Sequence, residues 1–197
     1  MAKIIYLMGK SSTGKDTIYK ELLRKGAVDL HTIVPYTTRP IRAGEREGVE
    51  YLFTDEDGFQ RLLEAGKVIE DRAYNTFHGL WRYFTVDDGQ IDLQEKDYIM
   101  IGTLEAYEKM KAYFGEDKLL PVLIELDDGV RLQRALNRER KQKHPKYEEM
   151  CRRFLADSED FSEENIKRAG ITRRFYNDEL SRCLDEITDY IKANLSR

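Results

Sequence analysis

The chain has 197 residues, a length that suits one α/β unit with appended segments better than two independent domains. Hydrophobic residues make up 41% and charged residues 36%, which is the balance of a soluble globular protein. The formal net charge of −4 excludes a sequence-wide basic field for nucleic acid or an anionic membrane, so an anionic substrate needs a local basic pocket.

Cysteine content and apolar run length indicate the compartment. Cys151 and Cys183 are the two cysteines and have no CxxC spacing, which argues against a disulfide framework or a zinc site. The first apolar run, residues 4–8, is too short for a signal core or a membrane span. We therefore expect a cytoplasmic protein without membrane or nucleic-acid partners.

Short apolar runs alternate with helical patterns along most of the chain. Strands are expected at residues 4–8, 33–36, 68–74, 81–86, 98–101, 119–126 and 171–176. Helices are expected at residues 15–25, 54–65, 103–114, 130–140, 147–158 and 178–195, with a short one from 162. Thr54, with Asp57 three residues on, is expected to cap the second helix. Such alternation predicts a parallel sheet covered on both faces, with an inserted lobe where the alternation breaks at 36–90.

The segment from Gly9 to Thr17, GKSSTGKDT, lies between the first strand and the first helix. In this context GxxxxGK wraps backbone N–H groups round phosphate oxygens, and the helix N-terminus adds positive potential. Gly9 and Gly14 permit the turns, and Lys15 reaches the β- and γ-phosphates. We predict a P-loop that binds ATP through Gly9, Ser11, Ser12, Thr13, Gly14, Lys15, Asp16 and Thr17.

Asp16 stands where a P-loop usually has Ser or Thr, whose hydroxyl contacts magnesium. A carboxylate can ligate Mg²⁺ directly or through water, and it can also repel phosphate. We expect Asp16 to contact the Mg²⁺ that accompanies ATP.

The loop after the second predicted strand carries a compact set of donors. Arg39 and Arg42 lie three residues apart, and Tyr51 follows nine residues on. Guanidinium forks bind phosphate bidentately and keep their charge. Residues 37–53 resemble the acceptor-phosphate site of guanylate kinases, whose pattern is close to TTR-x-x-R-x-GE-x-x-G-x-x-Y-x-F, and every fixed position is met. Together with the P-loop, this resemblance spans essentially the whole chain.

The resemblance implies a P-loop NTPase fold with a parallel-sheet core at 1–35, 91–130 and 161–197, an acceptor lobe at 36–90 and a helical lid at 131–160. It also implies a guanylate kinase-like phosphotransferase that converts GMP and ATP to GDP and ADP. Phosphoryl transfer needs alignment and charge neutralisation more than covalent help. The expected partners are small-molecule nucleotides.

Further site residues follow from the resemblance alone. Glu70 matches a residue that accepts from guanine N1 and N2, Tyr83 a phosphate-binding Tyr, and Thr85 a guanine-contacting hydroxyl. The chain between Glu70 and Tyr83 is longer than the family usually has, and His78 within it is expected to be a surface loop residue.

The lid and the last strand supply the remaining positions. Arg138 and Arg153 match the two lid arginines that neutralise the transferring group, with Arg140 as the alternative to Arg138. Asn177 matches an Asn near the adenine of ATP.

One segment departs from the family pattern. After the second core strand the family usually has D-x-D-x-Q-G, whereas residues 100–105 read MIGTLE, with no carboxylate at either Asp position. Asp16 is a candidate replacement for the charge near magnesium. Guanine specificity is the property that this departure affects.

Two alternatives stay open at the level of sequence. Ribose 1,5-bisphosphate kinases also resemble guanylate kinases and also place Asp after the P-loop Lys, so the acceptor can be another phosphorylated metabolite. A non-catalytic guanylate-kinase-like interaction module is the second alternative. Such modules typically lose P-loop residues, whereas Gly9, Gly14 and Lys15 are all present.

Overall fold

A five-stranded parallel sheet forms the centre of the computed structural model, which describes residues 2–42, 44–76 and 79–195. The strand order is β2-β7-β1-β8-β9, and every neighbouring pair is parallel. The strands are β2 (His31–Thr32), β7 (Tyr98–Ile101), β1 (Ile4–Met8), β8 (Leu119–Glu125) and β9 (Arg174–Tyr176). The P-loop NTPase fold expected from the sequence is confirmed.

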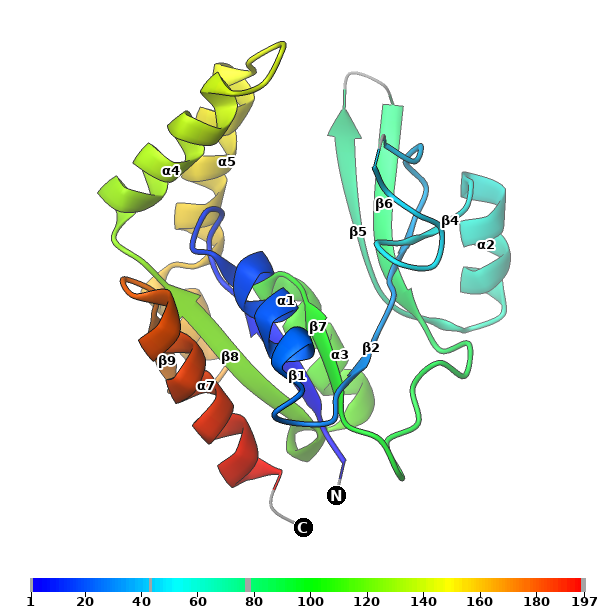
Figure 1. Ribbon diagram of the computed structural model, residues 1–197. Coiled ribbons are helices and arrows are strands. Elements are labelled where there is room, and N and C mark those ends of the chain that lie inside the picture. The colour runs from blue at the N-terminus through cyan, green and yellow to red at the C-terminus, as the bar shows by residue number, and fades with distance from the viewer. Residues whose placement is uncertain (1, 43, 77–78, 196–197) are drawn as a thin grey trace.

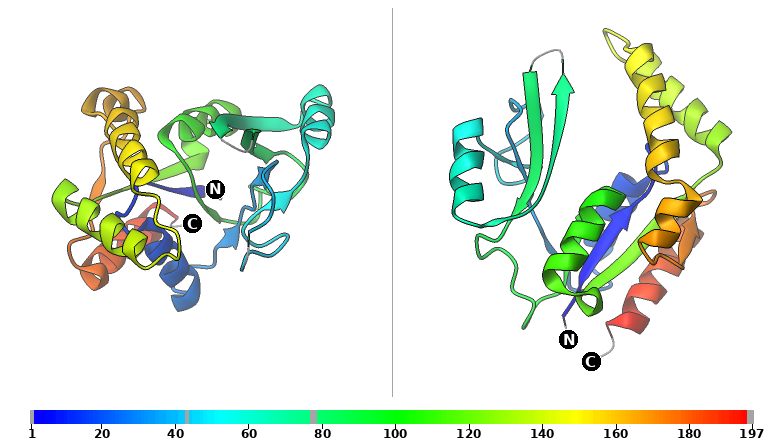
Figure 2. Two further views of the ribbon diagram at one scale, coloured as in Figure 1. Left: turned by 90° about the horizontal axis from the view of Figure 1, so that it is seen from above. Right: turned by 180° about the vertical axis from the view of Figure 1, so that it is seen from behind.

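Side chains of β1 alternate between two apolar layers, because successive residues of a strand point to opposite faces. Ile4, Tyr6 and Met8 pack with α3 (Leu104–Phe114) and α6 (Glu163–Arg168). Ile5 and Leu7 pack on the other face with α1 (Lys15–Lys25) and α7 (Leu180–Asn194). Figure 1 shows α1 and α7 on one face of the sheet, and Figure 2 shows α3 on the other. All five residues of β1 are buried, as a strand covered on both faces requires.

A second, mixed sheet stands beside the core, with strand order β4-β3-β6-β5. Its strands are β3 (Tyr36–Thr37), β4 (Leu52–Phe53), β5 (Val68–Thr76) and β6 (Gly79–Val86). Helix α2 (Glu56–Glu64) packs on this sheet through Phe59, which contacts Phe84 with ring centroids 4.9 Å apart. This small core stabilises the β5–β6 hairpin on its outer side and leaves the opposite face toward α3.

Helices α4 (Asp128–Arg140) and α5 (Tyr147–Asp160) form an antiparallel pair beyond the carboxyl end of β8. Figures 1 and 2 show this pair and the β5–β6 hairpin rising on opposite sides of the carboxyl edge of the core sheet. The loop between β1 and α1 lies at the same edge, next to the base of α5. Ligands of open α/β sheets bind at this edge.

Several boundaries differ from the sequence-based expectation. The strand predicted at 33–36 is replaced by the two short strands β2 and β3, because Val34 donates its backbone N–H to the side chain of Gln90 at 2.8 Å instead of to a strand. The cap of α2 is Asp55, which accepts from the N–H of Gly58 at 2.7 Å, so the assignment of the cap to Thr54 was wrong. Strand β4 was not anticipated, and β9 is shorter than predicted.

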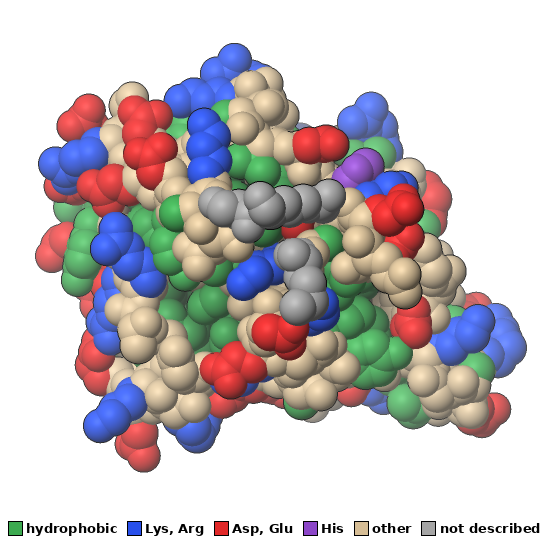
Figure 3. All heavy atoms as spheres, turned by 90° about the horizontal axis from the view of Figure 1, so that it is seen from below, with side chains coloured by type: hydrophobic (Ala, Val, Ile, Leu, Met, Phe, Trp, Pro, Cys, Tyr) green, Lys and Arg blue, Asp and Glu red, His purple; other side chains and the backbone are tan. Residues whose placement is uncertain are grey.

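Charged side chains of both signs are interspersed on the face shown in Figure 3. Among the described residues, no helix is long and apolar enough to cross a membrane. His78 lies outside the described residues.

Candidate active site

Two glycines shape the loop between β1 and α1. Gly9 has a φ of 150°, and a Cβ there would lie 2.2 Å from the carbonyl oxygen of Ile124. Gly14 has a φ of 93°, and a Cβ there would lie 2.3 Å from Nδ2 of Asn177. Any side chain at either position would displace the neighbouring strand or Asn177, so the loop conformation depends on both glycines.

Asn177, which follows β9, holds the loop between β1 and α1 in place. It is buried, and its Nδ2 donates to the backbone carbonyl of Thr13 at 2.7 Å. The Thr13 hydroxyl donates to the carbonyl of Lys10 at 2.9 Å, which closes the turn. The resemblance implies a place for Asn177 near adenine, and its hydrogen bond to Thr13 shows that it also supports the P-loop backbone.

Ser12 adopts a backbone conformation that residues other than glycine seldom have, with a φ of 67°. Its hydroxyl is buried and has no hydrogen-bond partner within the described part of the chain. Such a backbone conformation persists where surrounding contacts fix it, and it concentrates at functional sites.

Lys15 begins α1 and points into a region of mixed charge. Burial lowers the pKa of its ammonium group, and Arg131 and Arg138 add to that effect, while Asp16 and Asp157 oppose it. A bound phosphate would favour the charged form of Lys15 and so raise the pKa that burial lowers. Lys15 is therefore arranged to gain from an anion at the P-loop.

Asp157 of α5 and Arg131 of α4 contact the P-loop from the lid side. The backbone N–H of Ser11 donates to Asp157 Oδ2 at 2.7 Å, and Arg131 Nη2 donates to the same oxygen at 3.1 Å. Arg131 Nε donates to the carbonyl of Ser11 at 3.0 Å, and its guanidinium also pairs with Asp128. Arg131 is completely buried by these contacts. The carboxylate of Asp157 thus occupies a backbone donor of the kind that P-loops offer to phosphate.

No individual role was assigned from sequence to Arg131 or to Asp157. An acidic residue on a charged helix gives no local signal of this role. The contact arises because α5 returns alongside α4 and brings Asp157 to a loop 146 residues earlier in the chain.

The two lid arginines assigned from sequence lie in different surroundings. Arg138 is exposed and acts electrostatically on Lys15. Arg153 is also exposed, and its Nε donates to Glu149 at 2.7 Å, a carboxylate that Arg152 shares. The structure brings Arg138 toward the P-loop and leaves Arg153 paired within α5.

The carboxylate of Asp16 is accessible to a magnesium ion. It is exposed in the first turn of α1, and no hydrogen bond or ion pair with another described residue occupies its carboxylate. No group of three or more His, Cys, Asp or Glu side chains that could hold a metal occurs among the described residues. Mg²⁺ is usually held by one or two carboxylates, substrate phosphates and water, so a single carboxylate beside the P-loop fits the ion.

Arg39 is the most buried charged group of the acceptor loop. Its side chain is 3% exposed and forms a bidentate pair with Glu45, at 2.6 Å and 2.8 Å. The hydrogen bonds from Arg39 lower the pKa of Glu45. The guanidinium lies 4.9 Å from the ring centroid of Tyr51 and 6.0 Å from that of Tyr83. The structure therefore gathers Arg39, Tyr51 and Tyr83 into one cluster.

The Nε of Arg39 is buried and has no hydrogen-bond partner among the described residues. Arg42 is exposed, and its guanidinium lies 6.0 Å from the ring of Trp81. The backbone N–H of Arg42 donates to Glu45 at 2.9 Å, which fixes the turn between the two arginines. Guanidinium groups of this kind bind phosphate bidentately.

Glu70 and Thr85 lie in contact, and both belong to a network with Arg72, a residue that the sequence analysis did not name. The Thr85 hydroxyl donates to Glu70 Oε1 at 2.7 Å. Arg72, two residues along β5, donates to Glu70 from Nε at 3.1 Å and from Nη2 at 3.4 Å. Its Nη1 donates to the hydroxyl of Thr103 at 3.4 Å.

The side chain of Tyr6 lies against Gly102, next to the network of Glu70, Arg72 and Thr103. A Cβ at Gly102 would lie 1.7 Å from the Tyr6 hydroxyl and 2.4 Å from Cζ of the same ring. Tyr6 is completely buried and donates to the carbonyl of Thr103 at 3.1 Å. Position 102 therefore has no room for a carboxylate side chain, because the phenol ring of Tyr6 occupies the space that a Cβ would need.

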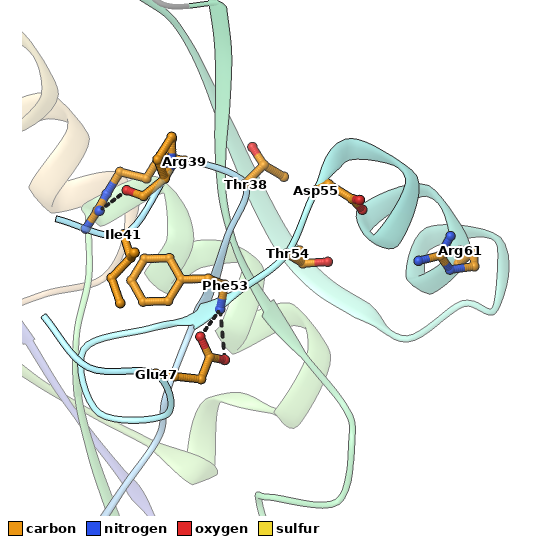
Figure 4. A pocket seen from close by; sticks show the side chains of 9 residues that line it. Thr38, Arg39, Ile41, Glu47, Phe53, Thr54, Asp55 and Arg61 are labelled. Carbon is orange, nitrogen blue, oxygen red and sulfur yellow. Dashed lines mark hydrogen bonds between the residues drawn. The ribbon is translucent and has the colours of Figure 1, made fainter.

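Two hollows lie near these clusters. The first lies on the α2 side of the acceptor loop, where Figure 4 shows Ile41 beside Phe53 and Glu47 bonded to the backbone of Phe53. Arg39 is in its wall, but Tyr51 and Tyr83 are not. The second lies beside the P-loop, between Lys10 and the carboxyl ends of β8 and β9. Its wall includes Lys10 and Thr13 of the P-loop but not Lys15, and it holds the carboxylates of Glu125, Asp127, Asp128 and Glu163.

Comparisons with known proteins agree with this geometry. The guanylate kinase family profile matches residues 1–80. The guanylate kinase of Porphyromonas gingivalis is 28% identical over the whole of both chains, and that of Caldanaerobacter subterraneus subsp. tengcongensis is 28% identical over 98% of this chain and 88% of its own. The crystal structure of guanylate kinase from Anaplasma phagocytophilum superposes with a TM-score of 0.68 at 17% identity, over 100% of this chain and 87% of that one.

The parallel core, the P-loop before α1 and the lobes on either side define a P-loop NTPase fold. With this fold, the chain is similar to guanylate kinases over its whole length, and it is a guanylate kinase-like phosphotransferase.

Proposed function

We propose that this enzyme transfers the γ-phosphoryl group of ATP to the phosphate of a nucleoside monophosphate, with GMP as the leading acceptor. The full-length similarity to proteins named guanylate kinase supports the choice of GMP. The observation that carries the proposal is the pairing of an intact P-loop containing Lys15 with a separate cluster of Arg39, Tyr51 and Tyr83.

In this mechanism an oxygen of the acceptor phosphate attacks the γ-phosphorus in line with the leaving ADP oxygen. Lys15 and the backbone N–H groups of the P-loop bind the donor phosphates. Arg39 and Arg42 orient the acceptor phosphate. The acceptor is already anionic near neutral pH, so the chain needs no general base. Arg138 and Arg153 neutralise charge on the transferring group when the lid closes.

Magnesium, held by Asp16 together with the phosphates of ATP, would supply charge neutralisation at the β- and γ-phosphates. Arg153 has to exchange Glu149 for phosphate on closing, because the two side chains are paired at 2.7 Å. Ser11 has to exchange the carboxylate of Asp157 for a phosphate oxygen.

A kinase of another phosphorylated metabolite is a second candidate function. It is favoured by the engagement of Glu70 with Arg72 and Thr85, and by the phenol of Tyr6 beside Gly102. Both features change the part of the acceptor site that a guanine base would meet.

A steady-state assay of ADP formation with GMP, dGMP, AMP and ribose phosphates tests the proposal. We expect turnover of at least one acceptor and a loss of about a hundredfold or more in Lys15→Ala. Lys20→Ala, on the exposed face of the same helix, is the matched control and is expected to retain activity. Absence of phosphoryl transfer to every acceptor would contradict the proposal and favour an interaction module.

A further inference from the structure

The carboxylate of Glu70 has little hydrogen-bonding capacity left. Its Oε1 accepts from Thr85 at 2.7 Å and from Arg72 Nη2 at 3.4 Å, and its Oε2 accepts from Arg72 Nε at 3.1 Å. A carboxylate oxygen accepts about two hydrogen bonds, so Oε1 is full and Oε2 has one position left. The N1 and N2 donors of guanine need one acceptor on each oxygen. In this arrangement Glu70 cannot serve both.

Arg72, in contrast, has donors to spare. A guanidinium has five N–H groups. Within the described chain, two of them bond to Glu70 and one bonds to Thr103. Burial by itself would lower the pKa of Arg72, but Glu70, Tyr6 and Tyr74 together raise it above its ordinary value, so the group stays charged. Beside Glu70, the groups still available for hydrogen bonding are therefore the remaining N–H donors of Arg72.

Arg72 also lies on the face of the hairpin that carries the acceptor cluster. In the β5–β6 pairing Arg72 is opposite Tyr83, and Glu70 is opposite Thr85 two residues away. The Tyr83 ring contacts that of Tyr51 with centroids 5.6 Å apart. Arg72 is therefore placed between the Glu70–Thr85 pair and the cluster around Arg39, and its side chain is 14% exposed.

We propose that Arg72, oriented by Glu70, is the specificity-determining residue of the acceptor site and binds a hydrogen-bond-accepting or anionic group of the acceptor. The inference rests on the proposed function. Two kinds of acceptor offer such a group. One is a 6-oxopurine nucleotide, whose O6 and N7 edge pairs bidentately with arginine. The other is a sugar phosphate with a second phosphate, which a guanidinium fork also binds.

The first test compares kcat/KM across acceptors. If the purine edge is bound, IMP should equal GMP within about threefold, because the N2 amine is not contacted, while AMP and 7-deaza-GMP should fall by about tenfold or more. If a second phosphate is bound, ribose 1,5-bisphosphate should exceed ribose 5-phosphate by about tenfold or more, with all purine nucleotides weak. A preference for GMP over IMP of about tenfold would instead assign recognition to Glu70 and overturn the inference.

The second test removes the guanidinium. Arg72→Gln should lower kcat/KM for the preferred acceptor by about ten- to a hundredfold and abolish the discrimination between acceptors, with KM for ATP unchanged. Arg82→Gln is the matched control, because Arg82 lies on the same hairpin but pairs with Glu56 and Asp71. Arg72→Lys keeps the charge without the fork and covers the case in which the Gln variant does not fold. Unchanged discrimination in a folded Arg72 variant would overturn the inference.

Glu70→Gln separates positioning from contact. If Glu70 only orients Arg72, this variant should lower kcat/KM and leave the ratio between GMP and IMP unchanged. A change in that ratio would show direct contact between Glu70 and the base. Calorimetric binding of the same acceptors without ATP, to the parent and to Arg72→Gln, reports on Arg72 independently of turnover. Loss of turnover with intact, Arg72-dependent binding would therefore count against the proposed function and not against this inference.

Discussion

Arg39 has a structural contact with Glu45 and a proposed role in binding the acceptor, and removing the side chain should reveal both. Its bidentate pair with Glu45 is largely buried, so Arg39→Ala should destabilise the protein by about 1–3 kcal/mol, since Glu45 loses both bonds. KM for the acceptor should rise by about tenfold or more, with less change for ATP. Arg42→Ala is the matched comparison, because Arg42 is exposed and should raise KM without loss of stability. Equal effects on KM for both substrates would contradict the assignment.

The stability part of this prediction depends on pH. Hydrogen bonds from Arg39 depress the pKa of folded Glu45 below its ordinary value of 4.5. A depressed carboxyl pKa contributes stability that is fully present above the unfolded pKa and is lost as the pH falls through the folded one. The difference in unfolding free energy between the parent and Arg39→Ala should therefore be constant near neutrality and shrink below pH 4.5.

Asp16 is the residue through which magnesium dependence can be tested. Asp16→Asn keeps the shape of the side chain and removes its charge, so the concentration of Mg²⁺ for half-maximal activity should rise several-fold. Titration of Mg²⁺ at fixed ATP measures this, with Asp29→Asn, just after α1, as an exposed control. An identical Mg²⁺ optimum in the Asp16 variant would show that the carboxylate is only tolerated.

At the scale of elements, the contact between α5 and the P-loop predicts competition with the nucleotide. Asp157 occupies the N–H of Ser11, so Asp157→Asn should bind ATP several-fold more tightly, because a neutral amide competes less well than a carboxylate for that donor. Calorimetric titration of ATP without acceptor measures the effect. Asp160→Asn, one turn further along α5, is the control. Weaker ATP binding in a folded Asp157 variant would show that this carboxylate assists the nucleotide.

The packing of β1 against the end of β7 gives a second prediction at this scale. Gly102→Ala should destabilise the fold by about 1–3 kcal/mol, because a Cβ there overlaps the ring of Tyr6. Tyr6→Val creates space at the same place. The double variant should therefore be more stable than the sum of the single changes predicts, a non-additivity that thermal unfolding can measure. Additive losses would mean that the two positions do not share this volume.

At the scale of the whole molecule, the two lobes rise on opposite sides of the P-loop edge (Figure 2). Transfer requires donor and acceptor phosphates in contact, so the lid and the acceptor lobe have to approach each other when both sites are filled. The radius of gyration from small-angle X-ray scattering should decrease when a non-hydrolysable ATP analogue and the acceptor are added together. Either ligand alone should have a smaller effect, and no change with both present would indicate a lid already closed.

The core of this fold could be predicted from the amino-acid sequence. Strands at 4–8 and 98–101 and the helix at 15–25 were predicted with the bounds that the structure has, because buried parallel strands are continuous apolar runs and glycine marks the helix end. The P-loop was predicted from the GxxxxGK spacing, which is also a local pattern. Short edge elements such as β2, β3 and β4 were not predictable, since two residues of strand depend on partners and carry no periodic pattern.

Tertiary structure decided what the charged residues do. Sequence named Glu70 and Thr85, but the partners that occupy Glu70 depend on which side chains share a face of the β5–β6 hairpin. The contact of Asp157 with Ser11 joins residues 146 positions apart, and the exclusion of a side chain at Gly102 depends on the ring of Tyr6 from another strand. Local patterns determine elements because backbone conformation is a local property. Which charges neutralise one another is set by distances in space, and only the packed chain fixes those distances.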